Sequence, residues 1–205
     1  MSPPSLRHVG DWGVAAVLLC LTAPLMMGIA VLIWLDDGTP VLFEQRRAGK
    51  HGKPFSLFKF RTLSAEAEGT PHPAQHTTRV GAVLRRWALD ELPQLWNVIR
   101  GDMNLVGPRP VLLPEARGYD EEAARRLAIR PGLTGWAQVH GRNRLSWAER
   151  MELDLWYVRN RTLLLDLWIL LKTPFVLLSG QGVYGPGTDD PSASEVQSHL
   201  SSPDA

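Results

Sequence analysis

The sequence predicts an α+β fold that is mostly helical and begins with a helix embedded in a membrane. Residues 12–35 are apolar and uncharged, residues 41–45 and 55–62 alternate as short strands do, and helical patterns dominate the later segments. Because about 20 apolar residues cross a hydrocarbon core of about 30 Å, the first run is long enough to be embedded. We therefore expect a membrane helix, a small β-hairpin and further helices, some of them amphipathic and lying at the membrane surface.

The charge balance limits the partners of the chain. Among its 205 residues, 22 Lys and Arg nearly balance 21 Asp and Glu, so the formal net charge is +1. This balance argues against a protein that binds nucleic acid through general basicity. Cys20 is the only cysteine and lies inside the apolar run, which excludes a disulfide within the chain.

Pro24 divides the apolar run near its middle. Proline removes a helical hydrogen bond and bends or breaks a helix, which leaves two arms at residues 12–23 and 25–35. Each arm is about 16–18 Å long, close to half the hydrocarbon thickness. A re-entrant hairpin in one leaflet and a kinked helix that crosses the bilayer both fit these lengths.

Flanking charges predict which side of the membrane holds the rest of the chain. Arg7 precedes the apolar run, whereas four basic residues follow it closely: Arg46, Arg47, Lys50 and Lys53. Since positive charge is retained on the cytoplasmic side, we expect the following domain on the cytoplasmic face of the inner membrane.

Two predicted strands surround a turn rich in Gly and Pro at residues 49–54. In the second strand, alternation places Lys59 and Arg61 on the same face. These two cations could bind an anion together, or they could be solvated charges on a strand surface.

Asp90 and Glu91 form an acidic pair where a helix is expected to begin. Pro93 lacks a backbone donor and is tolerated in the first helical turn, so the helix over residues 95–99 should start a few residues earlier. Asp90 is then the expected N-cap. A carboxylate at this position stays ionised and lies where backbone donors also attract phosphate.

Two cationic loops follow the acidic pair. Arg109 stands between two prolines in residues 100–110, which suits a fixed fork that binds phosphate, although such a residue could also be part of a plain turn. Residues 130–143 are rich in glycine and supply four candidate substrate-binding residues: Arg130, Gln138, Arg142 and Asn143. Neither a P-loop nor a Gly-x-Gly-x-x-Gly run is present, so standard nucleotide folds are not indicated.

Two helices are predicted near the end of the chain. Ser146 and Glu149 form a capping box that opens a helix through about residue 160. Residues 162–179 are far more apolar but are interrupted by Asp166, Lys172 and Pro174. We expect this segment to lie along the bilayer surface, with a buried core helix as the alternative.

Together these features predict phosphoryl chemistry on a lipid-borne substrate. Neighbouring residues on a helix point about 100° apart, so Asp90 and Glu91 should have different roles. We expect Asp90 to attack as the nucleophile and Glu91 to hold a metal or activate the acceptor phosphate. Mg²⁺ suits the pair, since it binds through one or two carboxylates and substrate phosphates.

Six ordered motifs resemble those of the bacterial sugar transferases, the monotopic polyprenyl-phosphate phosphoglycosyl transferases. They are FEQRRAG at residues 43–49, KFRT at 59–62, LDELPQL at 89–95, GDM at 101–103, GPRP at 107–110 and RPGLTG at 130–135. The resemblance implies transfer of a sugar 1-phosphate from a nucleotide sugar, usually a UDP-sugar, to polyprenyl phosphate. It also implies release of UMP and an early membrane step in exopolysaccharide or glycoconjugate assembly.

The same resemblance assigns roles to individual residues. It implies Mg²⁺, an aspartyl intermediate at Asp90, and phosphate contacts from Lys59, Arg61 and Arg109. It also implies a re-entrant helix broken at Pro24, which favours the hairpin over the crossing helix. The family often has serine before this proline, whereas the present chain has alanine.

The resulting domain prediction has three parts. Residues 1–35 form the re-entrant helix, residues 36–184 the catalytic domain with its interfacial helices, and residues 185–205 a disordered tail. A hydrolase with water as acceptor and a non-catalytic adaptor that binds nucleotide sugars are the alternative functions. The lipid-facing surface also permits a homodimer.

Overall fold

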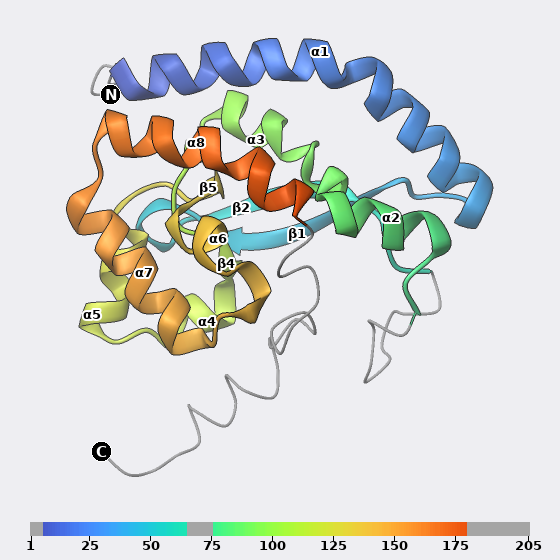
Figure 1. Ribbon diagram of the computed structural model, residues 1–205. Coiled ribbons are helices and arrows are strands. Elements are labelled where there is room, and N and C mark those ends of the chain that lie inside the picture. Colours follow the sequence, from blue (N-terminus) through green and yellow to red (C-terminus); the bar gives the residue numbers. More distant parts are fainter. Residues whose placement is uncertain (1–5, 65–75, 180–205) are drawn as a thin grey trace.

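A computed structural model of the chain describes residues 6–64 and 76–179 (Figure 1). The helices are α1 (Leu6–Asp37), α2 (Arg79–Trp87), α3 (Gln94–Arg100), α4 (Leu113–Arg117), α5 (Glu121–Ala124), α6 (Trp136–His140), α7 (Trp147–Asn160) and α8 (Leu163–Leu178). The strands are β1 (Leu42–Ala48), β2 (Pro54–Phe60), β3 (Asn104–Val106), β4 (Val111–Leu112) and β5 (Gly132–Thr134). The predicted tail at residues 185–205 lies outside the described residues.

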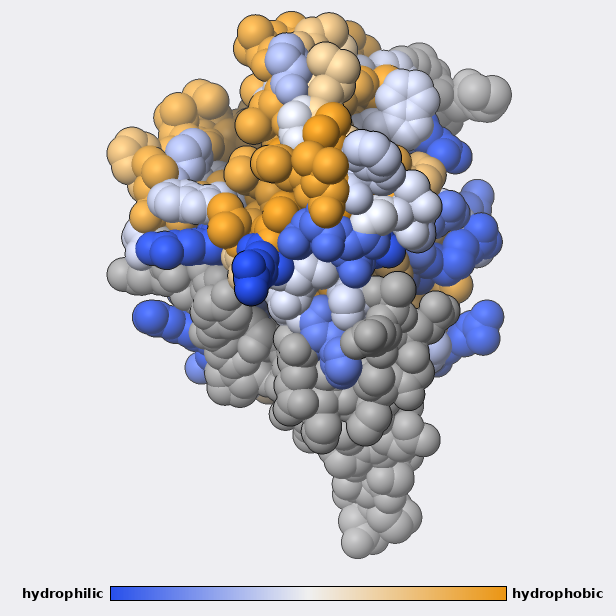
Figure 2. Space-filling model, turned by 90° about the vertical axis from the view of Figure 1, so that its right-hand side faces the viewer, coloured by the Kyte–Doolittle hydropathy of each residue, from blue (hydrophilic) through white to orange (hydrophobic). Residues whose placement is uncertain are grey.

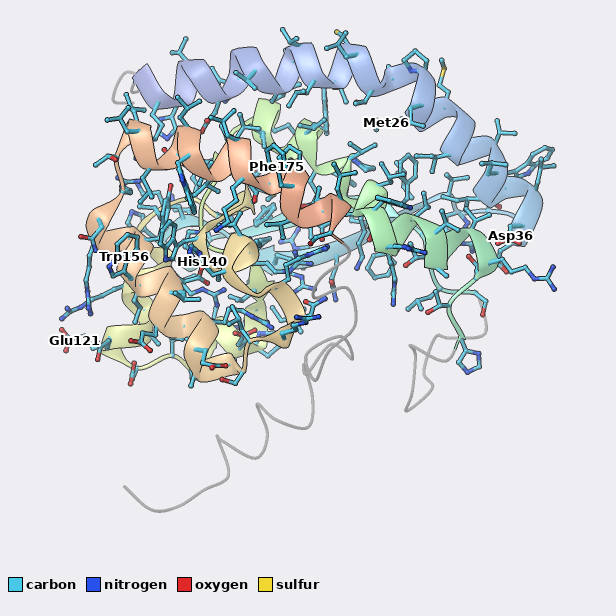
Figure 3. The ribbon with its side chains drawn as sticks, viewed as in Figure 1. Met26, Asp36, Glu121, His140, Trp156 and Phe175 are labelled. Carbon is cyan, nitrogen blue, oxygen red and sulfur yellow. The ribbon has the colours of Figure 1, made fainter. Side chains whose placement is uncertain are left out.

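Helix α1 lies along one side of the molecule and bends near its middle, close to Met26 (Figures 1 and 3). Its 32 residues form one helix that includes Pro24, so the predicted break is a bend. The hydroxyl of Thr22 donates to the carbonyl of Leu18 at 2.7 Å. Such a back-bond favours a helix bend. The family often has serine at the position of Ala23, and here the hydroxyl comes from the residue before it.

The two sides of α1 differ in burial. Ala15, Ile29 and Ile33 are buried against the rest of the protein. Ile29 and Ile33 pack with Phe60 of β2 and Leu84 of α2. The opposite side exposes large apolar residues along most of the helix: Val9, Trp12, Val14, Val17, Leu18, Leu21, Leu25, Met27, Val31, Leu32, Trp34 and Leu35. This apolar run is therefore long enough to cross a membrane and mostly unburied within the described protein.

The predicted hairpin is confirmed. Strands β1 and β2 pair antiparallel from Leu42 opposite Phe60 to Ala48 opposite Pro54, and a 3-10 turn (Lys50–Gly52) joins them. The short strand β4 adds to the other edge of β1. A separate parallel pair, β3 with β5, was not foreseen because strands of three residues are too short to show alternation.

Helix α7 begins at the predicted capping box. The Ser146 hydroxyl accepts a hydrogen bond from the backbone N–H of Glu149, and the Glu149 carboxylate accepts one from the backbone N–H of Ser146 at 2.8 Å. These reciprocal bonds satisfy donors that a helix start leaves open. Met151 and Leu155 then bury the inner face of the helix.

Helix α8 is not a buried core helix. Ile169 is its buried residue, whereas seven large apolar side chains are exposed: Leu163, Leu164, Leu167, Trp168, Leu171, Phe175 and Leu178. At its start, Asp166 pairs with Arg7 of α1, with Nε to Oδ2 at 3.0 Å. Figure 2 shows apolar side chains gathered at one end of the molecule above a belt of hydrophilic residues. The exposed side of α8 has the character expected of a helix lying along a bilayer.

An aromatic cluster joins α6, α7 and α8. Trp136 stacks on Trp156 with ring centroids 4.5 Å apart, and His140 lies 4.0 Å from Trp136. Figure 3 shows Trp156 and His140 close together below α8. Trp168 completes the cluster 5.3 Å from Trp136, so aromatic packing fixes these three helices relative to one another.

Candidate active site

Asp90 and Glu91 lie in a 3-10 turn (Leu89–Glu91) between α2 and α3. The prediction that Asp90 caps the next helix is wrong, because α3 begins at Gln94 after Pro93. Helix α2 ends at Trp87, and the left-handed φ of 54° at the next residue, Ala88, turns the chain into the 3-10 turn. The backbone N–H of Glu91 is used inside this turn, donating to the carbonyl of Ala88 at 3.2 Å. The acidic pair is thus held by the turn and its surroundings.

The two carboxylates have different electrostatic environments. Asp90 is 8% exposed, and burial together with the charge of Glu91 raises its pKa to about 6. Burial alone would also raise the pKa of Glu91, but the charge of Arg109 and its hydrogen bond lower it. Arg109 Nη2 lies 2.8 Å from Glu91 Oε1. At neutral pH both groups are ionised, and Asp90 is the stronger base of the two.

Three of the predicted cations act on this pair. Burial lowers the pKa of Lys59, and the charge of Asp90 opposes that shift. Arg142 has a left-handed φ of 54° and interacts electrostatically with Glu91, Arg109 and Asp90. The structure therefore brings together β2, the turn before α3, the loop after β3 and the loop after α6. Lysine and arginine charges surround a buried carboxylate there, as phosphate chemistry requires.

Two further arginines near the site were missed by sequence reasoning. The charge of Arg85 lowers the pKa of Asp90, and its Nε donates to the Thr62 hydroxyl at 2.9 Å. The charge of Arg47 acts on Lys59, and its Nη1 donates to the carbonyl of Pro110 at 3.4 Å. Both residues belong to Arg-Arg pairs, one inside the FEQRRAG motif and the other shortly before LDELPQL, which is the signal that could have identified them.

Glycines bring the two cationic loops into direct contact. A Cβ on Gly132 would lie 2.0 Å from the backbone N of Gly107, and one on Gly135 would lie 2.1 Å from the Gly107 carbonyl. The N–H of Gly107 donates to the carbonyl of Thr134 at 2.9 Å, and that of Gly132 donates to the carbonyl of Pro108. This contact places Arg109 and the segment leading to Arg142 on one framework.

Arg61 binds the end of α1, whereas Lys59 lies where the charge of Asp90 acts on it. Arg61 Nη2 donates to the carbonyl of Asp37 at 2.6 Å and lies 3.1 Å from the Asp37 carboxylate. Arg61 also donates to the carbonyl of Gly38, so it fastens the end of α1 to the sheet.

The remaining predicted residues lie in different surroundings. Arg130 is near the start of α1, where its charge acts on His8 and Asp11. Gln138 lies in α6, and its buried amide N and O have no hydrogen-bond partner in the described part of the chain. Asn143 lies in the 3-10 turn (Arg142–Arg144) next to Arg142. Their expected contacts with substrate stay predictions.

Asp90 and Glu91 could hold Mg²⁺ only together with ligands from the substrate. Within residues 6–64 and 76–179, no group of three His, Cys, Asp or Glu could hold a metal ion. Asp90 and Glu91 offer two adjacent carboxylates, and Arg109 engages one oxygen of Glu91. Mg²⁺ commonly binds through one or two carboxylates plus substrate phosphates and water, so the residues fit such an ion.

The site has a buried carboxylate beside several cations, and the fold exposes long apolar helices that indicate membrane association. Together they define a class of membrane-associated enzyme. Comparison with known proteins identifies the family. The profile described as bacterial sugar transferase matches residues 4–180, so the chain belongs to this family and is a transferase.

Three relatives are similar over most of the chain. "Uncharacterized sugar transferase EpsL" of Bacillus subtilis is 44% identical, covering 87% of this chain and 90% of the relative. "Exopolysaccharide production protein ExoY" of Rhizobium meliloti is 42% identical, covering 80% and 82%. "UDP-glucose:undecaprenyl-phosphate glucose-1-phosphate transferase" of Caulobacter vibrioides is 41% identical, covering 87% and 72%. The resemblance seen in the six motifs is therefore confirmed at the level of the family.

Proposed function

We propose that this protein transfers a sugar 1-phosphate from a UDP-sugar to polyprenyl phosphate through a covalent intermediate on Asp90. The observation that carries the proposal is the buried Asp90 carboxylate surrounded by Lys59, Arg109 and Arg142. The relative from Caulobacter vibrioides is named for a reaction of this kind, with UDP-glucose and undecaprenyl phosphate as substrates. Such a reaction would begin the assembly of a glycoconjugate or exopolysaccharide on the membrane.

In the first step, a carboxylate oxygen of Asp90 attacks the phosphorus that carries the sugar. A bond forms between this oxygen and phosphorus, and the bond from phosphorus to the bridging oxygen breaks, which releases UMP. Because burial and the nearby Glu91 charge raise the pKa of Asp90 to about 6, its carboxylate is a better nucleophile than an ordinary one. It is still ionised at neutral pH.

In the second step, an oxygen of polyprenyl phosphate attacks the same phosphorus. The acyl-phosphate bond to Asp90 breaks, the carboxylate is regenerated, and a polyprenyl-diphosphate sugar results. Glu91 is held by Arg109 at 2.8 Å and does not compete as the nucleophile. Its role is to position the phosphates through Arg109 and to help hold the metal.

Cations are required because the donor pyrophosphate, the acceptor phosphate and two carboxylates carry negative charge. Lys59, Arg109 and Arg142 would neutralise the phosphate oxygens while charge shifts onto the leaving UMP. Mg²⁺, held by Asp90 or Glu91 with substrate phosphates, would supply further neutralisation of the pyrophosphate.

The apolar face explains why the acceptor is a lipid. Helices α1 and α8 expose apolar side chains above a hydrophilic belt, so the protein would sit in the membrane with the site near the headgroups (Figure 2). We place α1 as a re-entrant helix, bent near Pro24, and the site on the cytoplasmic face of the inner membrane. A water acceptor would give no reason for this apolar surface.

The test is a donor-only reaction with the purified full-length protein in detergent. A panel of UDP-sugars is added with Mg²⁺ and without lipid, and both UMP release and the mass of the Asp90 peptide are measured. We expect about one UMP per protein and added sugar-phosphate mass on Asp90, followed by transfer when undecaprenyl phosphate is added.

Matched variants separate the outcomes. Asp90→Asn should give neither UMP nor adduct, whereas Glu122→Gln, which removes an exposed carboxylate on α5, should behave as the wild type. Continued UMP release without acceptor would indicate a hydrolase. Catalysis that required both substrates before any UMP appeared would contradict the covalent step, and absence of turnover with intact nucleotide binding would indicate an adaptor.

A further inference from the structure

Arg126 is a buried cation that the proposed reaction does not use directly. It lies in a 3-10 turn (Arg125–Ala128) after α5, and 3% of its side chain is exposed. Its Nη2 lies 2.7 Å from Asp154 Oδ2 of α7, and its Nη1 donates to the Tyr119 hydroxyl at 2.7 Å. A buried charge needs such partners, because an unpaired one would be strongly destabilising.

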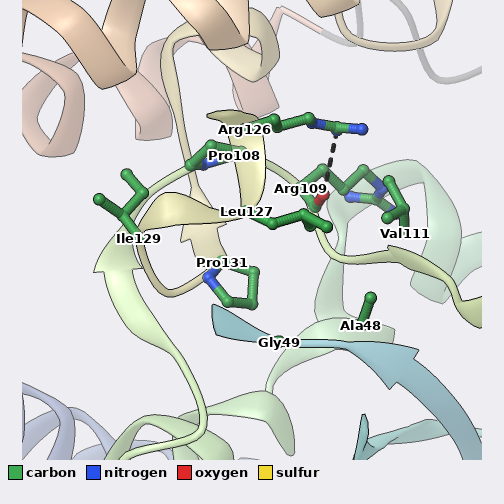
Figure 4. A pocket seen from close by; sticks show the side chains of 9 residues that line it. All are labelled: Ala48, Gly49, Pro108, Arg109, Val111, Arg126, Leu127, Ile129 and Pro131. Carbon is green, nitrogen blue, oxygen red and sulfur yellow. Dashed lines mark hydrogen bonds between the residues drawn. The ribbon is translucent and has the colours of Figure 1, made fainter. Parts of the chain in front are cut away.

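The same guanidinium also reaches the loop that carries Arg109. Arg126 Nη2 donates to the main-chain carbonyl of Arg109 at 3.1 Å, as the dashed line in Figure 4 shows. Arg109 and Arg126 both line a small hollow whose other walls are mostly apolar, among them Ala48, Gly49 and Pro131 (Figure 4). The hydrogen bond from Arg126 is therefore a polar contact to the Arg109 main chain beside mostly apolar walls.

Helix α7 supplies the carboxylate that holds Arg126. Asp154 and Tyr157 are three residues apart on one helix face, and both are almost fully buried. Asp154 acts through Arg126 on the carbonyl of Arg109. The Tyr157 hydroxyl donates its proton to Asp166 Oδ1 of α8 at 2.5 Å and lies 3.4 Å from the carbonyl of Val106. The Arg109 end of the segment 106–109 is therefore held to α7 through Arg126.

We propose that Arg126, held by Asp154, is a positioning residue that fixes the main chain of Arg109 and thereby directs the Arg109 guanidinium toward Glu91. Its effect on catalysis rests on the proposed function, whereas its effect on the loop does not. Arg126 has the planar fork needed to hold a carboxylate and a carbonyl at once, which lysine lacks. Arg126→Lys is thus the informative change, since it keeps the charge paired with Asp154.

The first measurement is hydrogen exchange, which needs no substrate. Arg126→Lys should raise the exchange rate of the amides in residues 105–112 about tenfold relative to the wild type, because one charge-assisted hydrogen bond to the loop is lost. The matched control is Arg159→Lys, which alters an exposed ion pair between α7 and Glu122. This control should leave exchange in residues 105–112 unchanged.

The second measurement is kinetic. Arg126→Lys should raise the KM for the UDP-sugar about tenfold with a smaller change in kcat, as expected for a displaced Arg109. In an Arg109→Ala background the same substitution should have no further effect on KM, because the side chain it positions is absent. A purely structural residue would lower activity by the same factor in both backgrounds.

The outcomes are separable. Unchanged exchange in residues 105–112 overturns the positioning role even if the transferase reaction is demonstrated. Equal KM effects with and without Arg109 overturn it as well. Raised loop exchange in a protein that transfers no sugar phosphate would support the positioning role while contradicting the proposed function. If Arg126→Lys does not yield folded protein, Asp154→Glu, which shifts the same ion pair by one methylene, is measured in the same way.

Discussion

Helices α1 and α8 differ from the loops around Asp90 in how their residues acquire a role. On α8, side chains such as Leu167 and Phe175 face outward and need only be apolar. Around Asp90, by contrast, the acidic turn, the Arg109 loop and the Arg142 loop come from distant parts of the sequence and depend on close backbone contact. The exposed apolar face of α1 and α8 should therefore tolerate exchange of one apolar residue for another. The site, by contrast, depends on where the backbone of each loop lies.

The largest expected effect is at Asp90. Asp90→Asn should lower turnover by at least about a thousandfold, because the attacking oxygen is lost.

The same variant should be more stable at pH 7 by about 1–3 kcal/mol, since burial raises the pKa of Asp90 from 3.8 to about 6 and makes its charged form unfavourable.

The sign of that stability effect can be checked by thermal unfolding at several pH values. A group with a raised pKa in the folded protein loses stability as the pH rises from about 4 through about 6, so the gain from Asp90→Asn should vanish near pH 4. A variant that is less stable than the wild type at pH 7 would contradict the raised pKa of Asp90 in the folded protein.

The next largest effect is expected where the two loops meet. Gly132→Ala would place a Cβ 2.0 Å from the backbone N of Gly107, so the β3–β5 pair must separate. We expect a loss of about 3 kcal/mol or more in unfolding free energy, measured by chemical denaturation. Gly28→Ala on α1, where a Cβ meets no atom within 4 Å, is the control and should be nearly neutral. Equal stability of both variants would show that the loops do not need this contact.

The pH profile tests the site without mutation. If Asp90 attacks as the carboxylate, kcat/KM should fall about tenfold for each pH unit below about 6 and level off above it. The measurement is UMP release across pH 4.5 to 8 at constant ionic strength. A rate that is flat down to about pH 4.5 would exclude a nucleophile with the raised pKa of Asp90.

Substitutions of Arg61 and Lys59 should have smaller and different effects, although strand alternation places both residues on one face. Arg61→Gln removes the ion pair with Asp37 and weakens the attachment of α1, which we expect to lower stability by about 1–3 kcal/mol with little change in KM. Lys59→Gln should instead raise the KM for the UDP-sugar. If Arg61→Gln raised KM with unchanged stability, Arg61 would belong to the site after all.

The smallest effect on the folded protein is predicted at the apolar face. Phe175→Ser on α8 should leave the melting temperature in detergent nearly unchanged, because this side chain is 73% exposed. Partition into liposomes should decrease, since apolar area that would enter the bilayer is removed. Comparable partition of the variant and the wild type would place α8 away from the membrane.

Local sequence features predicted a large part of the fold. The predicted strands at β1 and β2 and the capping box of α7 were correct because each depends on near neighbours in the chain. The N-cap role of Asp90 was wrong because the left-handed Ala88 and the following 3-10 turn delay the start of α3. Nothing in the local pattern marks Ala88 for that conformation.

The site was predicted in part for a similar reason. Lys59, Arg109 and Arg142 act on the acidic pair, whereas Arg61 pairs with the end of α1 and Arg130 lies near its start. Strand alternation could not show that Asp37 at the end of α1 lies within reach of Arg61. Arg85 and Arg47 entered the neighbourhood of the site only through folding.

Composition and local order were enough to predict the apolar helix that contains Pro24, the acidic pair and, through six short motifs, the family. Three features came from folding: which cations face Asp90, how Arg126 reaches the carbonyl of Arg109, and which of the two carboxylates is the stronger base. These depend on distances and burial between segments far apart in the chain, and charges interact according to such distances rather than sequence order.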